Sequence, residues 1–186
     1  MINVYDFDKT IYDGDSSIDF YFYCLKNKPS IILLLPKQFI AFVLYKLKIR
    51  DKKYFKEMFF SFVKKINNID KYINGFWKIS IRKIKPWYIS QKKHTDVIIS
   101  ASPEFLLLPI KKKLNISKII ASKVDVKTGN FLSNNCYGEE KVVRFKSEVN
   151  KKIKSFYTDS YSDMPMMLLA QEKYLVKNKQ IKKITI

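Results

Sequence analysis

The sequence has few of the residues that form disulfides, metal centres and flexible tails. Of its 186 residues only two are cysteines, Cys24 and Cys136. They lie far apart with no metal-like spacing, so neither a zinc site nor a disulfide framework is expected. Four glycines and six prolines argue against low complexity, while 47% hydrophobic and 15% aromatic residues suffice for a sizeable core. The single histidine, His94, has no partner pattern near it and is expected at the surface.

The sequence is also short of acidic residues, with 17 Asp and Glu against 36 Lys and Arg, which gives a net charge of +19. Such a balance is compatible with nucleic acid, an anionic membrane or small anionic substrates. The basic residues are nearly all lysines, dispersed in twos and threes, which favours a solvated surface. No nucleic-acid-binding motif is present, so no specific nucleic-acid partner is expected.

Long uninterrupted apolar runs are missing too. The N-terminus has neither a basic region nor an apolar segment typical of a signal peptide, which favours a cytoplasmic protein, with a membrane-peripheral location as the alternative. The most apolar stretch, residues 31–49, is interrupted by a proline, a glutamine and three lysines. It falls short of the about 20 apolar residues of a membrane span. We expect it to form a buried or interfacial helix.

Short apolar runs alternating with helical patterns predict an α/β fold. Residues 2–8 are typical of a buried strand, and residues 16–90 predict helices over 16–26, 31–47 with a kink at Pro36, 51–66 and 70–84. The rest predicts a strand at 96–100, a hairpin over 119–132, a helix at 139–150, a strand at 153–158, a helix from 162 and a strand at 174–177. This alternation indicates a three-layer, Rossmann-like parallel sheet. Residues 1–15 and 91–186 would form the core, and residues 16–90 an inserted all-helical cap.

Two aspartates end the first strand. Asp6 and Asp8 are two residues apart, so on a strand they point the same way. Two carboxylates that close repel each other unless a cation or a shared proton intervenes. A strand that ends in an Asp-capped turn is the alternative reading of this stretch.

Further polar residues follow the other predicted strands. Ser100 ends the second strand, Asp159 and Asp163 follow the strand at 153–158, and Lys141 lies in the first turn of the helix after Gly138. In open α/β sheets, ligands bind at the carboxyl ends of the strands. Carboxylates that leave room for water and a phosphate oxygen suit Mg²⁺.

These residues resemble the four motifs of the haloacid dehalogenase (HAD) superfamily, in particular its phosphoserine-phosphatase-like branch with a helical cap. In chain order the motifs are Asp6-Phe7-Asp8-Lys9-Thr10, Val97-Ile98-Ile99-Ser100, Gly138-Glu139-Glu140-Lys141 and Thr158-Asp159-Ser160-Tyr161-Ser162-Asp163. Thr158 replaces the glycine often found before the fourth-motif aspartate. The cap carries no recognisable motif.

The resemblance implies the chemistry of a Mg²⁺-dependent phosphatase. Asp6 would be the nucleophile that forms an aspartyl-phosphate, and Asp8 the general acid and base. Ser100 would bind a phosphoryl oxygen, and Lys141 would stabilise charge on the nucleophile and the transferring group.

The metal would be held by residues of the first and fourth motifs. Asp6 and Asp159 would ligate Mg²⁺ through their carboxylates and Asp8 through its backbone carbonyl. Asp163 would lie in or near the layer of residues that surrounds these ligands.

Four further residues lie near these motifs in the sequence and are candidates for the site or for local structure. Thr10 is expected to help bind phosphate. Arg144 lies one helical turn after Lys141 and is placed to face the same site, although a solvated position is equally open. Asp15 lies where phosphoserine phosphatases carry a glutamate that recognises the substrate amine, and a turn or cap role is the alternative. Ser102 precedes Pro103, which favours a helix N-cap.

The expected substrate is a small soluble phosphometabolite. One alternative is a lipid phosphate at a membrane, because the predicted cap is apolar and basic. Another, of a different class, is a basic nucleic-acid-binding protein with a degenerate HAD core. For the apolar face of the cap, packing on the core or on another subunit is favoured over docking on an anionic membrane surface.

Overall fold

The N-terminal strand lies inside a six-stranded sheet. The computed structural model describes residues 1–178 and 180–185, and its strands follow the order β3-β2-β1-β4-β5-β6. Five strands are parallel and β6 runs antiparallel to β5. Their bounds are β1 Ile2–Tyr5, β2 Val97–Pro103, β3 Lys118–Ser122, β4 Ile153–Thr158, β5 Ala170–Lys177 and β6 Gln180–Ile184. The predicted α/β class with a mostly parallel sheet is confirmed.

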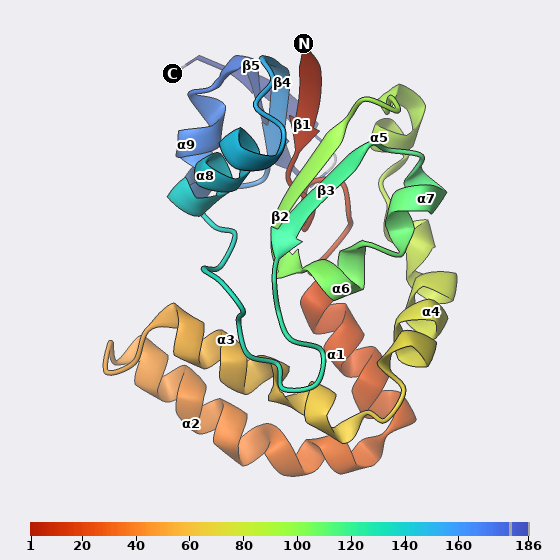
Figure 1. Ribbon diagram of the computed structural model, residues 1–186, viewed down its shortest axis with the longest axis vertical. Helices are drawn as coiled ribbons and strands as arrows, with labels where there is room; N and C mark the ends of the chain where they lie inside the picture. Colours follow the sequence, from red (N-terminus) through yellow and green to blue (C-terminus); the bar gives the residue numbers. More distant parts are fainter. Residues whose placement is uncertain (179, 186) are drawn as a thin grey trace.

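Helices cover both faces of this sheet, because each strand alternates its apolar side chains between two cores. Val4, Val97 and Ile99 pack in one cluster with residues of α8 (Glu139–Glu148) and α9 (Met164–Met167). Tyr5 and Ile98 point the other way, toward α5 (Pro86–Gln91), α6 (Glu104–Leu107) and α7 (Ile110–Leu114). Burial on both faces is why the strands read as continuous apolar runs. Figure 1 shows the two layers of helices on either side of the strands.

The predicted cap is helical. It contains α1 (Ser16–Asn27), α2 (Leu35–Lys46), α3 (Lys52–Phe60) and α4 (Ile69–Ser80). Asp51 caps α3 by accepting from the Tyr54 backbone N–H at 2.8 Å, and Asn68 caps α4. In Figure 1, α2 lies at the end of the molecule opposite both termini.

Three local predictions differ from the structure. Residues 29–34 form a 3₁₀ helix, and Pro36 falls in the first turn of α2 instead of kinking a single long helix, because a missing N–H costs nothing there. The helix predicted over 51–66 ends at Phe60 and continues as a 3₁₀ turn. The hairpin predicted over 119–132 is reduced to one bridge, Val124 to Phe131, since β3 pairs in parallel with β2 instead.

Aromatic side chains join the cap to the sheet. Trp77 of α4 packs edge-on against Phe7 and Tyr12, with ring centroids 6.2 and 5.8 Å apart, and its indole N–H donates to the Leu106 carbonyl at 2.7 Å. The segment α5, which lies inside the predicted cap range, packs on the sheet through Tyr88 against Tyr5. This packing places the last residues of the 16–90 range with the core.

Candidate active site

Asp6 is held in place by two donors. Its Oδ1 accepts from Lys141 Nζ at 2.7 Å and its Oδ2 from Thr10 Oγ1 at 3.0 Å. The chain turns sharply after β1, with Lys9 and Gly14 at φ of 60° and 128°, and the Lys9 N–H donates to the Gly14 carbonyl. The left-handed φ of Lys9 reverses the chain directly before Thr10, whose hydroxyl then reaches Asp6, and Gly14 closes the turn at a φ that glycine adopts without strain.

Lys141 bridges two carboxylates from different strands. Its side chain is only 2% exposed, and Nζ donates to Asp163 Oδ2 at 2.8 Å as well as to Asp6. Thr158 adds a hydroxyl to Asp163 at 2.8 Å. Burial disfavours the charge on Lys141, but the two carboxylates outweigh it, and the pKa of Lys141 is raised above its ordinary value. The ammonium is therefore a fixed positive charge beside Asp6.

The carboxylates nevertheless outnumber this charge. Burial raises the pKa of Asp6, Lys141 opposes the rise, and the nearby Asp163 and Asp8 add to it. Burial raises the pKa of Asp159 too, with Lys9 and Lys177 opposing the rise and Asp163 adding to it. Negative groups that raise one another's pKa in this way favour an additional cation.

Asp8 has a different environment from Asp6. Its Oδ1 accepts from the Ser16 backbone N–H at 2.6 Å and its Oδ2 from the Ser102 hydroxyl at 2.5 Å. Burial raises the pKa of Asp8 to about 6, with the charge of Asp15 adding to the shift and the serine hydrogen bonds opposing it. A carboxyl with a pKa near that value can exchange a proton at moderate pH, as a general acid and base must.

The prediction that Ser102 is an N-cap is wrong. The residue stays in strand β2, and α6 begins after Pro103 with no side-chain cap. Ser102 receives further contacts from the hydroxyls of Ser16 and Ser17, at 3.2 and 2.9 Å. It therefore orients Asp8.

Most of the predicted residues line one cavity of about 420 Å³, here called the catalytic cavity. They are Asp6, Asp8, Asp15, Ser100, Lys141, Asp159 and Asp163. Ser100 is buried in the middle of β2, where its hydroxyl accepts from the Ser102 N–H at 3.1 Å. Asp15 also caps α1 by accepting from the Ser17 and Ile18 N–H groups at 3.0 and 3.1 Å, which agrees with the cap alternative.

Two predicted ligand-binding residues lie elsewhere. Thr10 is fully buried behind Asp6 and is not among the residues that line the cavity. Arg144 is also buried, and it donates to the Ala121 carbonyl at 2.7 Å, the Asn134 carbonyl at 2.6 Å and the Ser133 hydroxyl at 2.6 Å. The guanidinium of Arg144 therefore anchors the loop before α8. Neither Thr10 nor Arg144 is placed to bind phosphate.

The sequence reading missed the contribution of α3. Lys52, Phe55, Lys56 and Phe59 line the catalytic cavity from the cap side. Lys56 donates to the Ala101 carbonyl at 3.1 Å and to Asn135 at 3.0 Å, and burial with the neighbouring Lys52 lowers its pKa to about 8. The spacing of these four residues places them on one helix face, a signal that was present in the sequence.

The donor set fits Mg²⁺. Asp6 and Asp159 line the same cavity, and within residues 1–178 and 180–185 no hydrogen bond to the Asp159 carboxylate is found. Over the same residues no group of three His, Cys, Asp or Glu is close enough to form an all-protein metal cage. Mg²⁺ is usually bound by one or two carboxylates with water and phosphate oxygens completing the octahedron, so two carboxylates facing a cavity are sufficient.

Similar folds occur among solved structures. A protein of unknown function from Bordetella pertussis Tohama I has a TM-score of 0.73 at 14% identity, covering 92% of this chain and 87% of its own. A phosphoserine phosphohydrolase-like protein from Francisella tularensis has a TM-score of 0.54 at 17% identity, covering 93% and 86%. A phospho-aspartyl intermediate analogue of phosphoserine phosphatase has 0.52 at 18%, covering 92% and 84%. At these identities the likeness concerns the fold.

A search of curated proteins gives no match. The sequence pattern of the haloacid dehalogenase-like hydrolases matches residues 4–168, which include every one of the aspartates described above. Together with the fold, this match shows that the chain belongs to the haloacid dehalogenase-like hydrolase family.

Proposed function

We propose that the protein is a phosphatase that hydrolyses a phosphomonoester through an aspartyl-phosphate on Asp6. The proposal depends on one observation, which is that the neighbouring carboxylates of Asp6 and Asp8 accept hydrogen bonds from different kinds of donor. Asp6 faces a fixed ammonium at 2.7 Å, whereas Asp8 accepts from a hydroxyl and a backbone N–H, and both line the catalytic cavity. Paired acids in different environments are suited to different roles.

The first step transfers the phosphoryl group to the enzyme. An Asp6 carboxylate oxygen forms a bond to phosphorus while the bond from phosphorus to the substrate oxygen breaks. Asp8 gives its proton to that leaving oxygen, which departs as an alcohol. Lys141 stays beside Asp6 and the hydroxyl of Ser100 faces the cavity, so both support the charge on the transferring oxygens.

The second step releases phosphate. Asp8, now ionised, takes a proton from water, whose oxygen attacks phosphorus while the bond to Asp6 breaks. Mg²⁺ bound by Asp6, Asp159 and the Asp8 carbonyl would neutralise charge between the carboxylate and the phosphate. Asp163 keeps Lys141 in position for both steps.

Hydrolysis of p-nitrophenyl phosphate tests the proposal. We expect turnover in the presence of Mg²⁺, loss of most of it with EDTA, and recovery when Mg²⁺ is added in excess, because the carboxylates otherwise repel the dianion. Full activity in EDTA, after exhaustive dialysis against it, would contradict the metal assignment. No release of p-nitrophenol under any metal condition would contradict the phosphatase assignment.

The pH profile should depend on Asp15. The pKa of Asp8 is about 6, and the charge of Asp15 helps to raise it. The first step needs Asp8 protonated, so kcat/KM should decline as the pH rises above this pKa. Asp15→Asn removes a negative charge, lowers the pKa of Asp8 and should move the decline to lower pH.

The pH at which kcat/KM declines is compared between wild type and Asp15→Asn on the same substrate. Titration of the substrate phosphate then affects both enzymes equally and cancels in the difference. Asparagine keeps the oxygen that caps α1. A profile that moves to higher pH, or does not move, would contradict the assignment of Asp8 as the acid.

A further inference from the structure

The cap presents an apolar face to solvent. Residues 29–46 have a mean hydropathy of 1.3, and by length and composition this segment could span a membrane. Only 17% of its residues are buried in the protein. The docking face is defined by its large exposed side chains, Ile32, Leu33, Leu35, Phe39, Ile40, Phe42, Leu47 and Ile49. Leu33 is 75% exposed and Phe39 is 66% exposed. The core therefore does not cover this face, and of the favoured prediction only pairing with another subunit is left as the alternative to a membrane.

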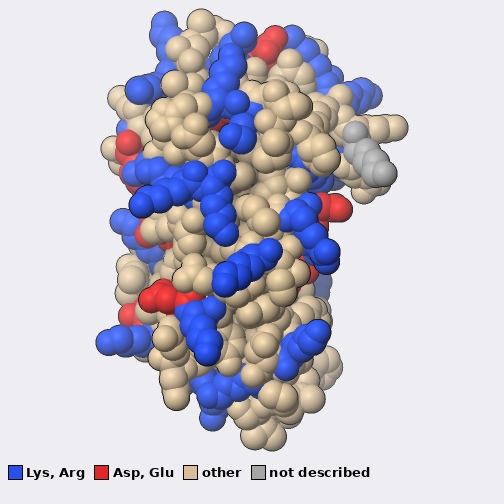
Figure 2. Space-filling view, turned by 90° about the vertical axis from the view of Figure 1, so that its right-hand side faces the viewer, with Lys and Arg blue, Asp and Glu red and all other residues tan. Residues whose placement is uncertain are grey.

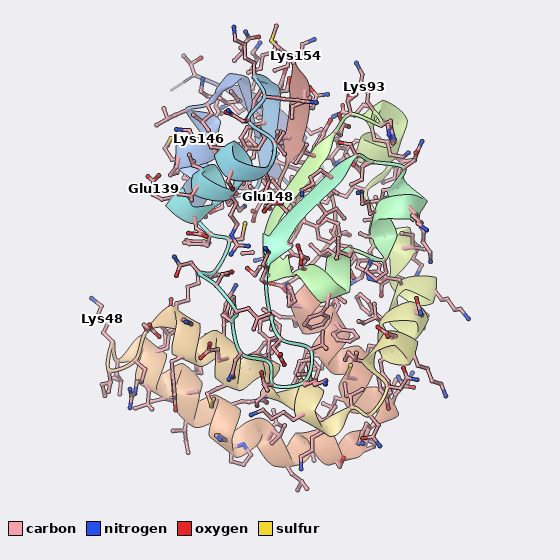
Figure 3. The ribbon with its side chains drawn as sticks, viewed as in Figure 1. Lys48, Lys93, Glu139, Lys146, Glu148 and Lys154 are labelled. Atoms are coloured by element: carbon pink, nitrogen blue, oxygen red, sulfur yellow. The ribbon has the colours of Figure 1, made fainter. Side chains whose placement is uncertain are left out.

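The segment that carries the docking face has positive charges but no negative ones. From Phe20 to Arg50 the sequence contains no Asp or Glu, but it contains Lys26, Lys28, Lys37, Lys46, Lys48 and Arg50. Lys48, at the connection between α2 and α3, points away from the body of the molecule (Figure 3). Elsewhere, on the side seen in Figure 2, lysines are spread over the whole surface and form no single patch.

This charge distinguishes between two possible occupants. A symmetric pairing of two copies would bring the same basic residues against one another, which is repulsive. An anionic lipid surface offers hydrocarbon to the apolar side chains and negative headgroups to the lysines around them. The composition of the face therefore favours a membrane.

An apolar groove leads from the docking face toward the reacting groups. This cavity of about 560 Å³ lies between α1, α2 and α3 and is lined by Tyr21, Leu35, Pro36, Gln38, Phe39, Phe42, Phe55 and Phe59. Phe55 and Phe59 also line the catalytic cavity. The groove and the catalytic cavity therefore share the side chains of Phe55 and Phe59 on α3.

We propose that the substrate is a phosphomonoester with a long hydrocarbon chain, taken from an anionic membrane surface on which the docking face lies. The proposal rests on the phosphatase function proposed above and specifies its substrate. The phosphate reaches Asp6, and the chain lies along Phe55 and Phe59 in the groove. This assigns the second of the substrate classes expected from the sequence, the lipid phosphate, in place of a small soluble metabolite.

Vesicle binding tests the docking face. The full chain should co-sediment with phosphatidylcholine vesicles containing phosphatidylserine, and less with phosphatidylcholine alone or at high salt. Leu33→Glu with Ile40→Glu should weaken binding by about tenfold or more, since each substitution withdraws a large apolar side chain from the lipid. Leu168→Glu is the matched control, because Leu168 is 63% exposed but follows α9 on the core.

Substrate chain length tests the groove. Hexadecyl phosphate in anionic vesicles should be hydrolysed with a higher kcat/KM than ethyl phosphate. Gln38→Glu places a charge in the groove, lies neither on the docking face nor in the catalytic cavity, and should reduce that preference. In Leu33→Glu with Ile40→Glu, the rate of hydrolysis should fall for hexadecyl phosphate and stay nearly unchanged for p-nitrophenyl phosphate.

Three results would overturn the proposal. The first is equal use of ethyl and hexadecyl phosphate, and the second is no vesicle binding at low salt, in each case by protein that hydrolyses p-nitrophenyl phosphate. The third is a dimer in solution that Leu33→Glu with Ile40→Glu dissociates, which would assign the face to a second copy of the chain. Absence of p-nitrophenyl phosphate hydrolysis would instead overturn the phosphatase function itself, and the substrate assignment with it.

Discussion

Asp6→Asn should abolish hydrolysis of p-nitrophenyl phosphate and leave the protein folded. An amide is a poor nucleophile, so kcat should fall by about four orders of magnitude or more, as for loss of a nucleophile in other covalent enzymes. Asparagine has nearly the same shape, and its oxygen can still accept from Lys141. The measurement is kcat together with the thermal unfolding midpoint.

Asp13→Asn is the matched control for this variant. Asp13 lies in the same turn but is exposed and outside the catalytic cavity, so its activity should equal that of wild type. An Asp6→Asn enzyme that is folded and keeps more than a small fraction of wild-type turnover would contradict the nucleophile assignment.

Lys141→Met should reduce both activity and stability. It removes the one ammonium that donates to Asp6 and to Asp163 among the contacts described above, and leaves two buried carboxylates facing each other. Breaking a buried ion pair from one side costs about 3–5 kcal/mol of unfolding free energy. Activity should fall as well, because the charge on the transferring phosphoryl group loses its fixed partner.

The stability loss in Lys141→Met should depend on pH. Lys141 lowers the pKa of Asp6 against burial, so its removal raises that pKa further in the folded state. A carboxyl whose pKa is raised by folding stabilises the protein when protonated and loses that contribution as the pH rises. The deficit measured by urea unfolding should therefore be greater at neutral than at acidic pH.

Two variants control this experiment. Lys146→Met, on an exposed position of the same helix, should change stability little (Figure 3). Adding Asp163→Asn to Lys141→Met should recover part of the lost stability, because one of the two unpaired charges is then gone. A Lys141→Met protein as stable as wild type at neutral pH would show that the carboxylates do not need this ammonium.

The core of the site could be predicted because strand ends converge. Asp6 and Asp159 each follow a parallel strand and Ser100 lies within β2, and the neighbouring strands bring all three to one cavity. Thr10 and Arg144 could not be placed in the same way. Their orientation depends on a tight turn and on a loop, and both bond to protein groups instead of facing the cavity.

Ser102 shows how one local signal can hide another. A serine before a proline and a glutamate is typical of a helix N-cap, but β2 continues through Pro103, with an irregularity in its pairing to β3 between Ile99 and Pro103. The contacts of Ser102 within the site decide its role, since its hydroxyl donates to Asp8 and its N–H donates to the Ser100 hydroxyl.

The cap could be predicted as helical but not positioned. Helix α2 is apolar around most of its circumference, so its periodicity does not indicate which side meets the protein. Gln38 and Ala41 turn out to be its buried residues, while Phe39 and Ile40 between them are exposed. Only tertiary packing decides this, and it also brings Lys56 from α3 to Ala101 at the end of β2.

The central claim is that phosphorus is bonded to Asp6 during turnover. Wild-type enzyme should be mixed with substrate and Mg²⁺, quenched in acid within the first turnovers and digested for mass spectrometry. The proposed mechanism predicts a phosphoryl group on the peptide containing Asp6, located on that residue by fragmentation and absent from Asp6→Asn. A phosphoryl group on any other residue, or none in an enzyme with a pre-steady-state burst of alcohol release, would contradict it.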